Sequence, residues 1–162
     1  MRQVIDADLA TFMQRPVMIV AATRAGQRPA IARGVGLRLG QDWTTIDLFV
    51  SREQWPEATR DLRAGLPFAV TLSDPTDYRT FQIKARLAEV ADADSEDQAG
   101  AENYVGRMSK TLRELGVEPR QAACWLVTED VVRLRLIPVS VFRQTPGPDA
   151  GAAHTPAPQG AA

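Results

Sequence analysis

One ten-residue stretch near the middle of the chain restricts the fold more than any other: YRTFQIKARL, residues 78–87. Side chains alternate between the two faces of a β-strand, and one face here carries the apolar residues Phe81, Ile83 and Leu87. That face belongs in a hydrophobic core, and the strand is predicted to continue to about Val90. The opposite face is polar and contacts either solvent or a ligand. It consists of Tyr78, Thr80, Gln82, Lys84 and Arg86.

Five other segments have the composition of strands, separated by turn residues or short helical patterns. They span residues 17–23, 30–39, 44–51, 66–73 and 130–142. The first three follow one another closely and predict an antiparallel meander. Apolar spacing and capping residues predict helices over residues 6–16, 55–65 and 94–116. Six antiparallel strands with few helices predict a mainly β fold, a closed or nearly closed barrel that would bind a ligand outside its filled interior.

The charge of the chain argues against two classes of partner. A formal net charge of −1 gives no electrostatic basis for binding nucleic acid or an anionic membrane. Residues 1–16 are acidic and amphipathic and contain no long apolar segment, which predicts neither a signal peptide nor a membrane span. We therefore expect a cytoplasmic protein. Its single cysteine, Cys124, lies in an apolar run, and we expect a buried, inert thiol.

Residues 144–162 are nearly all Gly, Ala, Pro and small polar residues. Such a segment cannot bury enough surface to order itself, which predicts a flexible tail after a single domain of residues 1–143. The only histidine, His154, lies in this segment. A zinc cluster, a Ser-His-Asp triad and a Cys-His dyad all need residues that the chain lacks. We expect no metal site, and the sequence identifies no catalytic residue.

Two basic residues flank two glycines within residues 30–39. Arg33 and Arg38 stand on either side of Gly34 and Gly36, and glycines weaken a strand unless something approaches its backbone closely. A flat ring laid against the backbone would need such a gap. The alternative is a strand that the glycines bend, with both arginines in solvent.

A second group of candidate ligand residues follows the strand at residues 44–51. Ser51 and Arg52 precede a predicted helix, where backbone N–H groups, a hydroxyl and a guanidinium can bind phosphate. Alternatively, Ser51 caps the turn and Arg52 is solvated. On the polar face of residues 78–87, Gln82 can donate and accept at once, which suits a ring edge, and Lys84 supplies a point charge for phosphate. Together these groups favour a phosphorylated aromatic ligand.

The order of these segments resembles the pyridoxamine 5′-phosphate oxidase-like family, the FMN-binding split β-barrels. The motifs are VMIVAAT, RPAIAR, DLFVS, DLRAGLPFAVTL and YRTFQIKARL, and the similarity covers roughly residues 12–144. The chain is similar to a branch with a YRT-QIKG-like strand and an ending of the type F-QTPGP-AG, which here is VFRQTPGPDAG. The resemblance implies a six-stranded antiparallel split β-barrel with Greek-key connections and a few flanking helices.

The resemblance also implies an FMN site at the interface of a homodimer. Carried over residue by residue, the FMN contacts and their substitutes fall on Arg33, Gly34, Val35, Arg38, Val50, Ser51, Arg52, Gln82 and Lys84. In the family, the residue matching Gln82 often reaches the partner's flavin. The family's Ser-x-Lys phosphate motif is missing, with Arg52 and Arg60 as the available substitutes, and Ala85 stands where relatives usually have Gly. The substrate elements of the true pyridoxamine phosphate oxidases are not visible, so vitamin B6 phosphates are not the expected substrate.

The leading hypothesis is an FMN-binding oxidoreductase with a small-molecule substrate, in which the flavin supplies the hydride chemistry. One alternative is a non-catalytic module on the same barrel that binds or senses flavin or deazaflavin. Another is a dimeric scaffold with no ligand. Other relatives bind haem, but here the only histidine lies in the expected tail.

Overall fold

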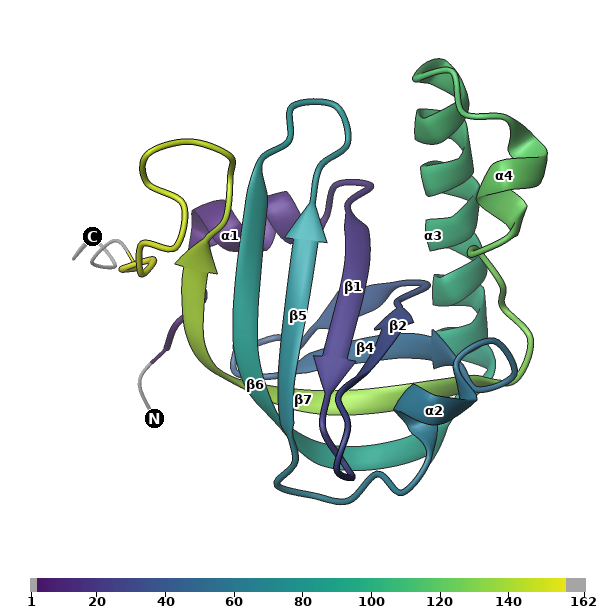
Figure 1. Cartoon of the computed structure of the whole chain (residues 1–162), viewed down its shortest axis with the longest axis horizontal. Helices are drawn as coiled ribbons and strands as arrows, with labels where there is room; N and C mark the ends of the chain where they lie inside the picture. Colours follow the sequence, from purple (N-terminus) through teal and green to yellow (C-terminus); the bar gives the residue numbers. More distant parts are fainter. Residues whose placement is uncertain (1–2, 157–162) are drawn as a thin grey trace.

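A single antiparallel sheet curls around a hydrophobic core, with helices at its edges and ends (Figure 1). The computed structural model describes residues 3–156. Across the sheet the strands follow the order β2-β1-β5-β6-β7-β4-β3. Their bounds are β1 Met18–Thr23, β2 Ala30–Arg33, β3 Leu37–Leu39, β4 Ile46–Ser51, β5 Pro67–Ser73, β6 Thr80–Asp92 and β7 Val131–Arg143.

The sheet has seven strands, whereas the sequence predicted six. The prediction of one strand over residues 30–39 is wrong because the chain leaves β1 after Arg33 and pairs with β4 from Leu37. β2 and β3 therefore lie at opposite edges of the sheet, so the predicted meander of the first three segments is wrong as well. Between them, Gly36 has φ +141°, a backbone conformation that residues with a side chain rarely adopt.

The crossing segment, residues 34–36, links the two edges of the sheet. The Gly34 N–H donates to the carbonyl of Ile19 in β1 (3.0 Å), and the Val35 N–H donates to the carbonyl of Phe49 in β4 (2.8 Å). The sheet therefore curls far enough for one short segment to bond with β1, next to one edge strand, and with β4, next to the other. This arrangement is a split barrel, in which the inward-facing side chains fill the interior.

The predicted alternation of side chains is confirmed from Phe81 to Leu87, whereas Thr80, predicted on the polar face, is buried. In β6 the four apolar side chains from Phe81 to Leu87 are buried, while Lys84 and Arg86 are exposed. Tyr78 lies before the strand, in a turn, at φ +60°. The apolar face of β6 therefore belongs to the barrel core, and its polar face points outward.

Two of the predicted helices are present as α1 (Ala7–Met13) and α3 (Ser95–Glu114). A capping box starts α3: the Asp94 side chain accepts from the Asp97 N–H (2.8 Å), and the Asp97 carboxylate accepts from the Asp94 N–H (3.3 Å). The third helix, α2 (Pro56–Thr59), is shorter than predicted because the backbone after it is already extended.

A fourth helix, α4 (Pro119–Ala123), was not predicted. It packs on α3 through Met108, Leu112 and Ala122, and the two helices stand together at one side of the sheet (Figure 1). Within residues 3–156, none of the helices has the length and apolar character that a membrane span requires.

Cys124 is exposed, so the prediction of a buried thiol is wrong. The apolar run around it ends a helix, and only one side of that helix faces α3. Ala122 is buried on that side, while Ala123 and Cys124 are exposed. The Cys124 thiol donates to the carbonyl of Arg120 (3.2 Å).

The chain after β7 folds back onto the barrel, although we expected that it would not order itself. Ala153 forms a β-bridge with Phe142, and the His154 N–H donates to the carbonyl of Val141 (2.8 Å). The segment needs no core of its own because its backbone groups bond with the existing strand. Residues 157–162 of the predicted tail lie outside the described residues.

Candidate functional site

Arg38, which we expected to contact FMN, belongs to an ion-pair network. Its guanidinium lies 3.0 Å from the Asp47 carboxylate and 2.8 Å from the Asp97 carboxylate. Arg135 also pairs with Asp47 (2.8 Å), and Arg133 pairs with Asp97 (3.3 Å). Burial by itself would lower the pKa of Arg38, but the hydrogen bonds and charges of Asp47 and Asp97 outweigh it and raise that pKa. Arg38 thus joins β3 to β4 and to the start of α3.

Ser51 and Arg52 also have partners within the chain. The Ser51 hydroxyl is buried; it donates to the carbonyl of Glu129 (2.7 Å) and accepts from the Gln54 N–H (3.2 Å). The alternative interpretation of Ser51, that it caps the turn, is therefore confirmed. Arg52 pairs with Asp130 (2.9 Å) and with a second carboxylate, so it is neither simply solvated nor free for a phosphate.

The chain itself fills the space beside the two glycines. A Cβ on Gly34 would lie 2.6 Å from a side-chain carbon of Ile19 and 2.9 Å from a second core side chain. A Cβ on Gly36 would lie 3.1 Å from Phe49 and 3.6 Å from the Ala101 backbone of α3. The glycines therefore allow close approach of the chain to itself, and no gap for a ring remains on this side.

Val35 and Val50 were expected where the backbone approaches the flavin, and both side chains are buried. Val35 packs with Phe49, Ala101 and Val131 beneath α3, in a small cluster outside the main core. Val50 points into the main core of the barrel. Both valines therefore contribute to packing.

Arg33, Gln82 and Lys84 are the remaining predicted residues, and their side chains are partly or fully exposed. Within the described part of the chain, none of the three pairs with a carboxylate. The Arg33 guanidinium lies over the Trp125 ring, 5.4 Å from its centroid, a cation–π geometry. The Gln82 amide donates to the hydroxyl of Thr71 (3.3 Å).

The strand register places these three residues on one face of the sheet. Arg33 pairs with Val20, Val20 with Thr71, and Thr71 with Gln82, which makes one row across four strands. Three strand spacings, about 14 Å in total, separate the ends of the row. A second row lies beside it and contains Ile31, Ala22, Ala69 and Lys84. We call these eight residues the outer face.

The outer face has small, mostly apolar side chains in the middle and a basic residue at each end. Val20, Ala22 and Ala69 form a floor of small side chains, and Ile31 is 61% exposed. The strands β1, β5 and β6 run side by side, and α3 and α4 stand next to them (Figure 1). Ile31 is the exposed large hydrophobic residue of this face, and the half-buried residues of the floor lie beside it.

Sequence reasoning missed Trp125 as a neighbour of Arg33. The tryptophan follows α4, far along the chain, and no local pattern links it to β2.

The residues do not fit FMN in the arrangement that the resemblance implied. Arg38 and Arg52 already form ion pairs with carboxylates of the chain, and the Ser51 hydroxyl already forms a hydrogen bond. Residues of α3 occupy the space beside Gly36. The predicted residues that lie on the outer face, Arg33, Gln82 and Lys84, remain able to contact a flat anionic ligand. The single histidine, His154, packs its ring against Phe81 of the inner face, so it is not placed to ligate haem iron on the outer face.

No protein-family model matches the chain, and no curated protein matches it. Several solved structures have a similar fold. HupZ from Group A Streptococcus has 12% identity and a TM-score of 0.53, covering 91% of this chain and 100% of HupZ. A Lactobacillus delbrueckii protein proposed to be a pyridoxamine 5′-phosphate oxidase has 12% identity and a TM-score of 0.50, covering 87% of this chain and 95% of that one. The heme storage protein HutZ from Vibrio cholerae has 14% identity and a TM-score of 0.48, covering 88% and 95%.

At these identities the likenesses show the fold and leave the ligand open. The fold assignment rests on the first two structures, whose scores are the higher ones. The chain therefore has the split-barrel fold of the pyridoxamine 5′-phosphate oxidase-like proteins.

Proposed function

We propose that this protein is a homodimeric split barrel that binds a flavin, with FMN as the first candidate, against its outer face and takes part in the oxidation or reduction of a small molecule. One observation carries the proposal. The row from Arg33 to Gln82, with Lys84 beside it, presents an amide and two cations around a floor of small side chains, and neither cation forms an ion pair within residues 3–156.

Each group on the outer face has a separate role in this proposal. The floor of Val20, Ala22 and Ala69 has small side chains on which a planar ring can lie. Arg33 and Lys84 lie at opposite ends of the floor, so one of them can pair with the phosphate while the other faces the far end of the bound molecule. Gln82 can donate to and accept from the edge of the ring.

A second copy of the chain is the proposed cover for this face. Ile31 and the floor carry no charge in the middle of this face, which suits an isologous contact between two identical copies. The cations at the ends of the floor would then lie at the rim of the interface. Burial between two copies would exclude water from the bound ring and strengthen its contacts with Arg33 and Lys84.

A bound flavin supplies the electron and hydride chemistry, so the chain needs no acid or base of its own for that step. The role of the chain is to bind the ring, to orient it through Gln82 and to exclude water. A chain with only these roles needs no catalytic cluster, and the sequence contains no recognisable one.

The first experiment is an absorbance spectrum of freshly purified protein, repeated after FMN is added and the excess removed. Retention of a two-banded flavin spectrum supports the proposal. Arg33→Ala combined with Lys84→Ala should lower FMN affinity about tenfold or more, with unchanged circular dichroism. Arg28→Ala, which removes an exposed charge in the β1–β2 turn, is the matched control. Equal FMN affinity in the double variant and in the control would contradict the site.

Sedimentation velocity tests the proposed dimer separately. Ala69→Arg places a charge in the middle of the floor and should convert a dimer into a monomer and abolish FMN retention. Ala88→Arg, at an exposed position on the same strand β6, should change neither property. A wild-type protein that is monomeric at all concentrations would rule out the interface.

A second candidate function is a sensing or scaffold module that does not retain FMN. The observation in its favour is that Arg38, Ser51 and Arg52 already have partners within the chain. This alternative predicts a colourless protein whose melting temperature does not rise with FMN or a deazaflavin. The same spectrum and a thermal-shift titration therefore distinguish the two functions.

A further inference from the structure

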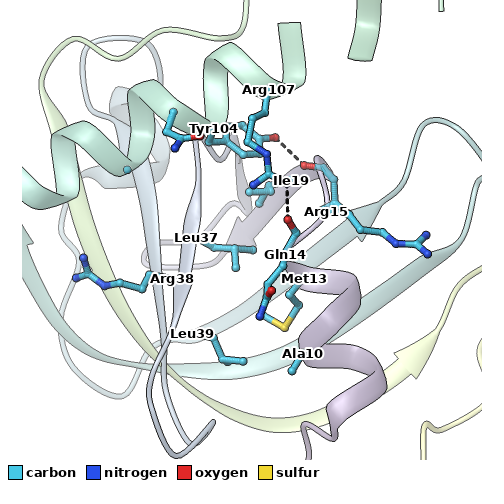
Figure 2. A pocket seen from close by; sticks show the side chains of 13 residues that line it. Ala10, Met13, Gln14, Arg15, Ile19, Leu37, Arg38, Leu39, Tyr104 and Arg107 are labelled. Carbon is cyan, nitrogen blue, oxygen red and sulfur yellow. Dashed lines mark hydrogen bonds between the residues drawn. The ribbon is translucent and has the colours of Figure 1, made fainter. Parts of the chain in front are cut away.

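A cavity of about 560 Å³ opens between α1, β3 and α3, away from the outer face (Figure 2). Its volume lies within the range of about 300–1,000 Å³ that is usual for small-molecule sites. None of the eight outer-face residues lines it. The cavity is therefore a second candidate site, and nothing in the proposed function uses it.

The floor of the cavity is apolar and comes from three separate elements. Met13 projects from α1, Ile19 from β1, and Leu37 and Leu39 from β3. Figure 2 shows these side chains pointing into the space between the helix and the strands. Met13 and Ile19 are already buried, so the apolar area that a ligand could remove from water belongs mainly to the half-buried Leu37 and Leu39.

Three arginines lie around this floor, and two of them are already neutralised. Arg15 pairs with Asp74 (3.2 Å), and Arg38 pairs with Asp47 (3.0 Å). These carboxylates are not among the residues that line the cavity, and none of its described lining residues is acidic. The charge presented to a ligand is therefore positive.

Arg107 is the third arginine, and it has donors to spare. Its one hydrogen bond goes to the main-chain carbonyl of Gln14 at the end of α1 (2.6 Å), whereas a guanidinium carries five N–H donors. No carboxylate within residues 3–156 pairs with it. Gln14 and Asn103 also line the cavity and offer neutral donors beside the charge.

Tyr104 adds no negative charge to the cavity. Its hydroxyl donates to the carbonyl of Val17 (2.7 Å). Burial raises the pKa of Tyr104, so the phenol stays neutral at physiological pH. An anion in the cavity therefore meets no ionised group of its own sign.

We propose that this cavity binds an amphipathic carboxylate, with the carboxylate on Arg107 and the apolar body on Leu37 and Leu39. A planar guanidinium matches a carboxylate in a two-bond geometry, and the uncharged floor accepts a hydrocarbon chain or ring. The competing interpretation is that Arg107 only clamps α3 to α1 through the Gln14 carbonyl. That interpretation predicts an effect on stability and no effect on ligand binding.

Isothermal titration calorimetry with octanoate tests the proposal on the full chain. Octanoate should bind, while 1-octanol and octylammonium, which share its chain length, should bind at least about tenfold more weakly because they lack the negative charge. Absence of octanoate binding to the wild type would overturn the proposal, and so would equal binding of the three compounds.

Two variants separate ligand recognition from a structural clamp. Arg107→Gln keeps a donor for the Gln14 carbonyl and removes the charge, and it should weaken octanoate binding about tenfold or more. Arg113→Gln removes an exposed charge from the same helix outside this cavity and should leave binding unchanged.

If Arg107→Gln does not fold, Asn103→Trp fills the cavity from its exposed rim and should abolish binding. Unchanged octanoate affinity in a folded Arg107→Gln or Asn103→Trp protein would overturn the proposal. These outcomes do not depend on whether FMN binds at the outer face.

Discussion

The imidazole of His154 lies 3.1 Å from the carboxylate of Asp6, although 148 positions separate the two residues. Both side chains are almost fully buried, and the imidazole ring meets Phe81 edge to face at 5.6 Å. Asp6 also caps α1, because its second oxygen accepts from the Leu9 N–H (3.0 Å). One carboxylate thus starts the first helix and holds the C-terminal segment against the barrel.

His154→Ala should lower the free energy of unfolding by about 1–3 kcal/mol, because it leaves the buried Asp6 carboxylate without this partner. Urea denaturation at neutral pH measures the change. Thr155→Ala, at the exposed neighbouring position, should change stability by less than about 0.5 kcal/mol. Equal stability of the two variants would show that the C-terminal segment does not depend on this contact.

Arg38→Ala should lower the stability of the protein, whereas Arg33→Ala should lower its retention of FMN. Loss of Arg38 removes one cation from the buried Asp97 and from Asp47, which should cost about 1–2 kcal/mol of stability because the side chain is partly exposed. Loss of Arg33 removes no ion pair and should affect FMN retention with little effect on stability. Thermal unfolding and FMN titration of both variants measure the two quantities, and a stable Arg38→Ala protein would contradict the structural role.

Asp47 should make stability depend on pH in the acid range. Burial by itself would raise the pKa of Asp47, but Arg135 and Arg38 outweigh burial and hold that pKa below its usual range. A carboxyl whose pKa is lower in the folded state contributes stability above its unfolded pKa of about 3.9, and that contribution is lost as the pH falls through the folded value. The stability difference between wild type and Asp47→Asn should therefore shrink between about pH 5 and pH 2. Urea midpoints across this range measure it, and a constant difference would contradict the assignment.

Gly34→Ala should destabilise the barrel by about 1–3 kcal/mol, because its Cβ would meet Ile19 at 2.6 Å in a packed core. Gly26→Ala is the matched control, since nothing lies within 4 Å of its Cβ position. Chemical denaturation of both variants measures the difference. If the two variants had the same stability, the crossing segment would not be tightly packed between the sheet edges.

Local patterns predicted the parts of the fold that depend on neighbouring residues. The alternation from Phe81 to Leu87 identified the core face of β6, and the acidic start of α3 identified its beginning, because both signals lie within a few residues. The break between β2 and β3 was missed because it depends on which strands lie at the two edges of the sheet. Gly36 signalled a close approach, but the sequence could not show that α3 provides it.

The candidate site was harder to predict because its residues find partners far along the chain. Ser51 forms a hydrogen bond with the Glu129 carbonyl, and Arg38 forms one with the Asp97 carboxylate. No local sequence pattern indicates either contact. A basic residue near a strand end has the same appearance in the sequence whether a phosphate or a distant carboxylate neutralises it. Arg33, Gln82 and Lys84 remain available to a ligand because they point outward, and this position is what distinguishes them from the other predicted residues.

The place of β7 in the sheet has a consequence for the nascent chain. β4 is joined to the rest of the sheet by β7 and by the crossing segment, and β7 ends at Arg143. The β3–β4 hairpin leaves the ribosome before its principal partner strand, which is translated only after β5, β6, α3 and α4. Until then Leu48 and Val50, which are buried in the finished barrel, lack that covering and present an unpaired strand edge to other chains. Chaperone capture of stalled chains should therefore fall sharply once the codons for β7 have been translated and that strand has emerged.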